Sequence, residues 1–333
     1  MSAIHQSAPL DLSPTINTRL LKLELGSSAI TPSFIISVRL HVTSLVDAPP
    51  YTAISYVWGE PSPTKQILLN GEAFTIRENL WNLLNRLRSE RHQGYLWIDA
   101  LSIDQTSNQE KNHQVAIMGS IYMQAQTTIC WLGVTAADIA DGIQVLTRLY
   151  ERRQYSLDYP LDTQLRNNPV FLYVIENPYW TRKWILQEYV LSANAEFWCN
   201  NWTIQAEILR WSIFHIRRWA GFPQASTVAW DMMSLGVNAR AGHPMVELLR
   251  RTHFCECVDP RDRIYALLSL LNPDEREAWS ISPNYAISME SLFEELVSAY
   301  PKSSYTIPLG SWKEELRELL FREGAVAGIS PWI

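Results

Sequence analysis

A single glutamate, Glu188, stands in a run of aromatic residues, where burying a carboxylate is costly. If the run "NPYWTRKWILQEYVLSA" is a helix, then Trp180, Trp184 and Glu188 share one stripe with Leu191, because residues four apart lie on the same helix face. Such a carboxylate is either paired or has a chemical role. In a partly desolvated setting it interacts strongly with nearby charge, and we expect its pKa to be raised.

Candidate binding residues, most of them polar, also follow two stretches that have the pattern of buried strands. They are Trp58, Gly59 and Glu60 after the first stretch, and Asp99, Ser102, Asp104 and Gln105 after the second. In open parallel sheets, ligands bind in the crevice outside the carboxyl ends of the strands. We therefore expect these residues to line a substrate-binding cleft.

Two of the acids have a simpler explanation. Asp99 fits a carboxylate that accepts backbone N–H bonds from the loop after the strand. Glu110 lies three residues after Ser107, which is the spacing of a capping box at a helix start. For both residues the sequence leaves the structural role and the functional role open.

Several other kinds of site have little support. His253, Cys255 and Cys257 lie close together, but they lack the four-ligand spacing of a structural zinc site, so we predict no metal site. The chain has no G-x-S-x-G, Walker or G-x-G-x-x-G motif. These absences remove the sequence support for a hydrolase elbow, a P-loop and a dinucleotide fingerprint, and we predict no cofactor.

Composition narrows the class of protein further. The chain has 333 residues and a formal net charge of −6, which argues against a phosphate backbone as the main partner. Its four cysteines do not make a disulfide framework and suggest reduced thiols. There is no signal-peptide pattern and no run of about 18 apolar residues, so we expect a cytoplasmic protein without membrane or nucleic-acid partners.

The first half of the chain alternates strands and helices, as an α/β fold requires. After a mobile leader to about residue 17, alternating patterns predict two lead-in strands, and "YTAISYVWG", "YLWIDA" and "TTICWLG" predict three buried strands. Asn70-Gly71 predicts a hairpin, and helices are expected behind a Thr75-x-x-Glu78 capping box and behind Ser107. This order implies a largely parallel sheet flanked by helices.

The second half is mainly helical. We expect helices over residues 136–150, 208–219, 244–251, 261–271 and 288–299, and a hairpin with Asn200-Asn201 at its turn. The domain organisation predicted is a leader with lead-in strands over residues 1–50, an α/β domain over 51–200, and a helical region over 201–333 packed on it.

Five motifs in order resemble the fungal HET (heterokaryon incompatibility) domain. They are "YTAISYVWGE", "ILLNGEAFTIRENLWNLLNRLR", "YLWIDALSIDQTSNQEKNHQVAIMGSIYMQA", "TTICWLG" and "RKWILQEYVLSA", and "DPRDRIYALLSLL" resembles a flank of such proteins. The chain departs from the family pattern at Ser102, where cysteine is common, and at Asp104, where asparagine is common. The extra negative charge at Asp104 disfavours an anionic ligand there.

The resemblance implies a fold and an activity. HET domains are distantly similar to Toll/interleukin-1 receptor (TIR) domains, which have a flavodoxin-like core, and many of these cleave NAD⁺ with a glutamate four residues after a tryptophan. Trp184 and Glu188 have that spacing, so the resemblance assigns Glu188 as the catalytic carboxylate. A carboxylate facing the developing cation stabilises the oxocarbenium-like state of glycosidic cleavage. Trp58 or Trp184 could stack on a ring of the nucleotide.

Three functions remain open at this point. The first is a TIR-like NAD⁺ glycohydrolase linked to cell death, which is expected to form homo-oligomers because such enzymes often need assembly. The second is a self-associating signalling module in which Glu188 is structural and pairs with Arg182, Lys183 or a backbone donor. The third is a biosynthetic enzyme on the same scaffold, because a fold alone does not give a function.

Overall fold

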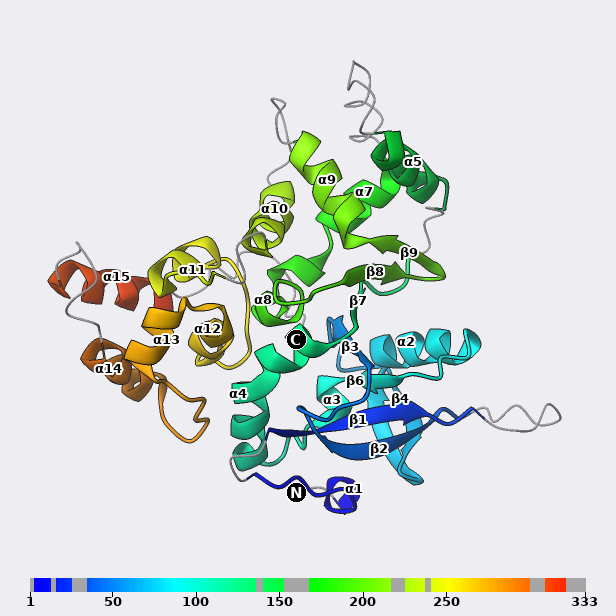
Figure 1. Ribbon diagram of the computed structural model, residues 1–333, viewed down its shortest axis with the longest axis horizontal. Helices are drawn as coiled ribbons and strands as arrows, with labels where there is room; N and C mark the ends of the chain where they lie inside the picture. The colour runs from blue at the N-terminus through cyan, green and yellow to red at the C-terminus, as the bar shows by residue number, and fades with distance from the viewer. Residues whose placement is uncertain are drawn as a thin grey trace.

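The computed structural model describes residues 3–12, 16–25, 35–135, 140–152, 168–216, 225–236, 241–299 and 309–321. Within these ranges one sheet has nine strands in the order β5-β4-β2-β1-β6-β3-β7-β8-β9 (Figure 1). The strands are β1 (Asn17–Leu23), β2 (Ser37–Ser44), β3 (Tyr51–Tyr56), β4 (Thr64–Leu69), β5 (Glu72–Arg77), β6 (Tyr95–Trp97), β7 (Thr127–Trp131), β8 (Ala195–Cys199) and β9 (Trp202–Gln205).

The centre of this sheet is parallel and its flanks are mixed. Strand β3 pairs in parallel with β6 and β7, and β7 pairs in parallel with β8. The pairs β1–β2, β1–β6, β4–β5 and β8–β9 are antiparallel. The predicted α/β class, the lead-in hairpin and the three buried strands are therefore confirmed. The central strands β6, β3, β7 and β8 run parallel to one another, and β6 and β8 each pair antiparallel with a flanking strand.

Both predicted hairpin turns form where left-handed residues allow them. Asn70 and Gly71 have φ of 53° and 83°, which suits the two-residue turn between β4 and β5. Asn200 has φ of 46° at the turn between β8 and β9. Asparagine and glycine tolerate this region of φ better than other residues, so these turns were readable from the sequence.

Two helices cover opposite faces of the central strands. Helix α2 (Glu78–Ser89) buries Leu80, Leu83, Leu84 and Leu87 in one cluster with Ile54 of β3. Helix α4 (Asn108–Gln124) buries residues that pack in another cluster with Ala53 of β3 and Trp97 of β6; they are Met118, Ile121 and Tyr122. Successive strand residues point to opposite faces, so β3 contributes to both cores.

The two predicted capping boxes have different outcomes. The one at Thr75 is wrong: Thr75 lies within β5, and Arg77 occupies the N-cap of α2 without a side-chain bond. At the second box Ser107 does cap α4, since its Oγ accepts from the N–H of Glu110 at 3.3 Å. The Glu110 carboxylate does not complete the box, because it pairs with Arg19 instead.

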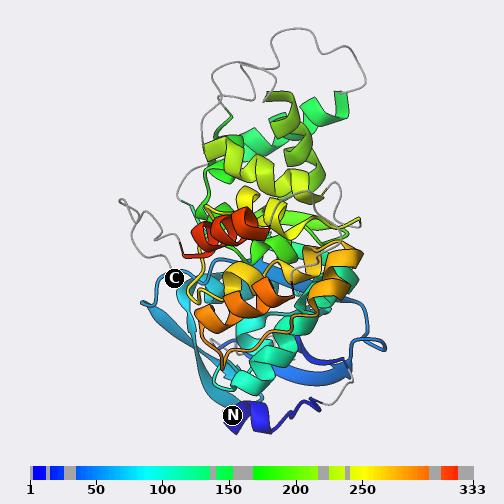
Figure 2. The same ribbon diagram turned by 90° about the vertical axis from the view of Figure 1, so that its left-hand side faces the viewer.

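The remaining helices surround the sheet: the first lies at its lower edge in Figure 1, and most of the later ones lie above it and to its left (Figures 1 and 2). They are α1 (Ala3–Gln6), α3 (Asp99–Ser102), α5 (Ala140–Glu151), α7 (Pro169–Ile175), η2 (Pro178–Thr181), α8 (Ile185–Glu188), α9 (Ala206–Ile216), α10 (Ala225–Leu235), α11 (Met245–Arg251), α12 (Asp262–Tyr265), η4 (Leu268–Leu270), α13 (Pro273–Trp279), α14 (Met289–Ser298) and α15 (Leu309–Phe321). The mainly helical second half is thus confirmed. The expected helical residues 136–139 and 217–219 lie outside the described residues.

Two expectations need correction. The helix expected over residues 261–271 is instead two short pieces, α12 and η4, and it stops because Leu271 is extended and the Leu270 carbonyl accepts from the N–H of His243 at 2.8 Å. The expected mobile leader contains α1, where His5 is 2% exposed and its Nε2 lies 3.0 Å from the Leu101 carbonyl.

All four cysteines are free thiols. Every helix in the described ranges is too short or too polar to span a bilayer.

Candidate functional site

The segment around Glu188 is not one continuous helix, so the expected aromatic stripe does not form. Asn177 and Pro178 begin the single turn η2, because the Asn177 Oδ1 accepts from the N–H of Tyr179 at 2.9 Å. Arg182 is then extended, with ψ of 131°, and forms a parallel bridge with Glu256. Helix α8 starts afresh after this break and ends at Glu188.

The Glu188 carboxylate is buried and hydrogen-bonded on two sides. It is 3% exposed, and its Oε2 accepts from Ser55 Oγ at 2.5 Å and from Arg182 Nη1 at 3.1 Å. Ser55 Oγ lies 2.7 Å from the Tyr179 hydroxyl. Burial raises the pKa of Glu188 and the nearby Asp99 carboxylate raises it further, whereas Arg182 and Ser55 oppose the rise.

A second carboxylate, Asp99, lies on the more open side of this centre. Its side chain is half-buried at the carboxyl end of β6, and it accepts from Trp58 Nε1 at 2.9 Å and from the N–H of Ala100 at 2.7 Å. Burial raises the pKa of Asp99, against the effects of Arg182 and Trp58. The bond to Ala100 is the loop-capping role that the sequence left open.

Arg182 pairs with Glu188 and also interacts electrostatically with Asp99. Its side chain is 19% exposed, so the centre reaches the surface at this residue. Burial lowers the pKa of Arg182, but Glu188 and Asp99 outweigh burial and leave the pKa raised overall. Two carboxylates with displaced pKa values around one guanidinium are the kind of arrangement found at functional sites and also in structural ion pairs. We refer to Ser55, Asp99, Arg182 and Glu188 as the acidic centre.

Other residues expected in the cleft have contacts outside the acidic centre or face the solvent. Trp184 Nε1 donates to Asp262 Oδ2 at 3.0 Å. Glu60 is exposed, and the Gly59 carbonyl accepts from Arg77 Nη1 at 2.6 Å. Among the residues predicted after the first strand, Trp58 is the one whose side chain bonds to the acidic centre.

The loop after β6 is held by its own contacts. Ser102 is fully buried, and its Oγ accepts from the N–H of Ile98 at 3.3 Å. Asp104 is 1% exposed and its Oδ1 accepts from the N–H of Thr106 at 3.0 Å. Gln105 is exposed and donates to the Asp99 carbonyl at 3.1 Å. These contacts fix the shape of the loop that carries Asp99. The side chains of Ser102 and Asp104 are buried inside this part of the protein.

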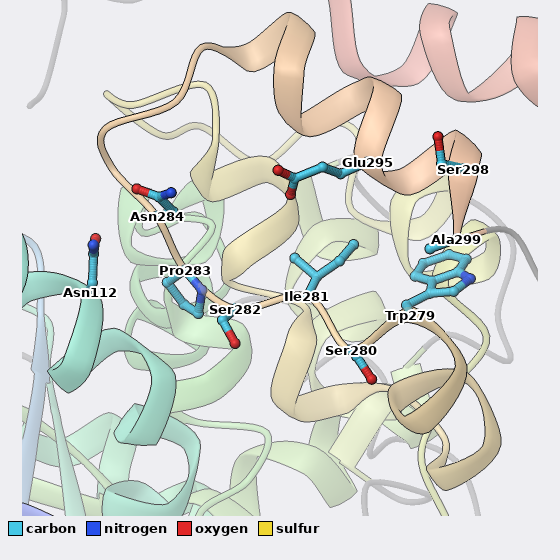
Figure 3. A pocket seen from close by; sticks show the side chains of 10 residues that line it. All are labelled: Asn112, Trp279, Ser280, Ile281, Ser282, Pro283, Asn284, Glu295, Ser298 and Ala299. Atoms are coloured by element: carbon cyan, nitrogen blue, oxygen red, sulfur yellow. The ribbon is translucent and has the colours of Figure 1, made fainter. Parts of the chain in front are cut away.

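A cavity in the described part of the chain lies elsewhere. It has a volume of about 790 Å³ and is formed by one residue of α4, the loop after α13, and α14 (Figure 3). Asn112, Asn284 and Glu295 present polar groups to it, and Ile281 contributes an apolar wall. Neither this cavity nor the neighbouring smaller one along α14 is lined by a residue of the acidic centre.

Sequence reasoning missed Ser55 and Tyr179 as members of this site. Ser55 is a small hydroxyl residue next to Ala53 and Ile54 in the strand "YTAISY", which is a weak signal for a buried polar contact. Tyr179 has no comparable signal, because tyrosine is common in buried clusters. Arg182 was considered as a partner of Glu188, and the structure confirms that pairing.

The comparisons with known proteins show similarity over part of the chain. Residues 51–188 match the family model described as heterokaryon incompatibility protein (HET), a range that runs from the start of β3 to Glu188. The chain is also 26% identical over 233 residues to heterokaryon incompatibility protein 6, OR allele, of Neurospora crassa. That match covers 56% of this chain and 33% of the relative. No solved structure is significantly similar to the chain.

Proposed function

We propose that residues 51–188 form a heterokaryon incompatibility domain and that the chain acts in the incompatibility response between fungal strains, as a TIR-like NAD⁺ glycohydrolase. The observation that carries the enzymatic part is the placement of Glu188. It lies beside the carboxyl end of β3, next to a second carboxylate and a partly exposed arginine. Ligands of parallel sheets bind at this edge.

The proposed reaction breaks the bond between nicotinamide and C1′ of its ribose. The bonding electrons leave with nicotinamide, which departs as a neutral molecule, and water adds to C1′ and releases a proton. The products are nicotinamide and ADP-ribose. The ionised Glu188 would stabilise the positive charge that develops on the ribose more than it stabilises the substrate. Trp58, which is partly exposed, offers a ring for stacking beside Asp99.

Arg182 must turn away from Glu188 for this reaction to occur, because in the present arrangement it donates to both carboxylate oxygens, at 3.1 and 3.5 Å. The side chain is partly exposed, and a substrate pyrophosphate is a suitable alternative partner for a guanidinium. Hydrogen bonds at apo sites often differ from those in the substrate complex.

A second function is favoured by the burial itself. Glu188 is 3% exposed and paired with a basic residue. Such a residue fits the structural role that Glu188 has in a non-enzymatic, self-associating signalling module. In that case the acidic centre holds α8 onto β3 and has no substrate.

The test is to incubate the full chain with NAD⁺ and measure nicotinamide release over a range of protein concentrations, because TIR-like enzymes often need assembly. Glu188→Gln and Glu188→Ala are expected to lose at least about 100-fold in rate. Glu72→Gln, at an exposed glutamate of the β4–β5 hairpin, serves as the matched control and is expected to keep the wild-type rate. Release that survives both Glu188 variants would remove Glu188 from the mechanism; no release by the wild type at any concentration would favour the signalling module.

A further inference from the structure

The segment that carries Arg182 and Glu188 is held by residues that follow the matched domain in the chain. The N–H of Lys183 donates to the Glu256 carbonyl at 2.9 Å, and the N–H of Glu256 donates to Thr181 at 2.6 Å. Lys183 Nζ donates to Thr252, and Gln187 Nε2 donates to the Tyr265 carbonyl at 3.0 Å. Residues 252–265 therefore form one side of the cradle for α8.

Asp262 is the acidic member of this cradle. It is 7% exposed, and both carboxylate oxygens are used: Oδ2 accepts from Trp184 Nε1 at 3.0 Å, and Oδ1 accepts from the Tyr285 hydroxyl at 2.5 Å. Lys111 Nζ lies 3.7 Å from the centroid of the Tyr285 ring, on the far side of this contact. Asp262 thus links the start of α8 to the loop between α13 and α14, which carries Tyr285.

Trp184 is well placed to pass this constraint on to Glu188. It is the N-cap of α8, and its carbonyl accepts from the N–H groups of Gln187 at 3.0 Å and Glu188 at 3.2 Å. The helix has only four residues, so its internal bonds alone do not fix its direction, and the outside contacts of Trp184 and Gln187 help to hold it. A rotation of Trp184 would move the Glu188 carboxylate away from Ser55.

We propose that Asp262 is a positioning residue that acts through Trp184 to hold the Glu188 carboxylate against Ser55. Its effect on catalysis rests on the proposed glycohydrolase function. Its effect on the placement of α8 does not. Residues 252–265 therefore contribute to the function of the site, although they lie outside residues 51–188.

The experiment compares Asp262→Ala, Asp262→Asn and Trp184→Phe in the full chain. Asp262→Ala and Trp184→Phe are expected to lower kcat by about tenfold to 100-fold while KM changes by less than about threefold, because a displaced group loses rate more than binding. Asp262→Asn is expected to restore kcat to within about threefold of the wild type. Its amide oxygen can accept from Trp184, and its amide N–H can donate to the Tyr285 hydroxyl oxygen.

Controls separate positioning from a general loss of structure. Asp274→Ala, at an exposed aspartate of α13, is expected to leave kcat unchanged. The double variant of Asp262→Ala and Trp184→Phe is expected to lose no more than the worse single variant. Each of the two changes removes the same hydrogen bond, the one between Trp184 and Asp262. Equal kcat losses in Asp262→Ala and Asp262→Asn, or additive losses in the double variant, would overturn the proposal.

Hydrogen exchange keeps the inference testable if the wild type releases no nicotinamide, an outcome that would count against the proposed function alone. Asp262→Ala is then expected to speed amide exchange at residues 186–189 by about tenfold or more, with unchanged exchange in α4 and with rescue by asparagine. Unchanged exchange at residues 186–189 would overturn the positioning role independently of any activity.

Discussion

Replacement of Glu110 with alanine is expected to destabilise the protein far more than the loss of a helix cap would. Arg19 and Glu110 are 0% and 1% exposed, and the guanidinium donates to both carboxylate oxygens, at 2.5 and 3.0 Å. Glu110 Oε1 also accepts from the N–H of Asp104 at 2.6 Å. The variant therefore leaves a buried cation and a buried N–H without this acceptor.

The expected magnitude follows from these contacts. Breaking a buried ion pair by removing one partner costs about 3 to 5 kcal/mol. Arg19 keeps bonds to the carbonyls of Ala8 and Ser102, which places the expected loss near the lower end, about 3 kcal/mol. A capping role alone would give a loss of about 1 kcal/mol. The two explanations of Glu110 are therefore separable by measurement.

The assay is urea denaturation of wild type and Glu110→Ala, with the m-value checked for constancy. The matched control is Glu24→Ala, which removes a solvent-exposed pair with Arg39 and is expected to cost less than about 1 kcal/mol. A loss below about 1 kcal/mol for Glu110→Ala, or equal losses in the two variants, would refute the reasoning that the buried pair braces the loop carrying Asp99.

Two further changes test the strand-end loop and the cradle of α8. Gly59 has φ of +78°, and an added Cβ would lie 3.0 Å from the Asn79 Cβ. Gly59→Ala is therefore expected to lower the free energy of unfolding, measured by urea denaturation, by about 1 to 3 kcal/mol. The loss should exceed that of Gly71→Ala, because a Cβ at Gly71 meets nothing within 4 Å. Burial raises the pKa of Asp262 from 3.8 to about 6, so between these values the folded state binds more protons than the unfolded state and stability falls as pH rises. Asp262→Asn lacks this fall, and its free energy of unfolding relative to wild type should increase from pH 4 to pH 7 by on the order of 3 kcal/mol. A difference that does not change with pH would contradict the assignment.

Local chemistry explains which parts of the fold could be predicted. The Asn70-Gly71 turn depends on two neighbouring residues that tolerate positive φ, and the helix over residues 78–89 depends on leucines at helical spacing. Ser107 caps α4 three residues before the N–H that it accepts from. Each of these features is decided within a few residues, so the sequence pattern carries it.

The parts that could not be predicted depend on distant partners. Nothing near Arg182 ends the expected helix. The segment becomes extended because it pairs with Glu256, which lies 70 or more residues further along the chain. Ser55 meets Glu188 across a sequence separation of 133 residues. Tertiary contacts of this kind override local propensity, and one sequence alone does not reveal them.

We propose above that the Glu188 carboxylate promotes cleavage of the nicotinamide–ribose bond of NAD⁺. The most direct measurement is proton NMR of NAD⁺ incubated with the full chain, wild type or Glu188→Gln, in which nicotinamide and ADP-ribose are followed together. We expect equal amounts of the two products from the wild type and a rate at least about 100-fold lower from a folded Glu188→Gln variant. Equal rates from the two proteins, or intact NAD⁺ with both, would contradict this proposal.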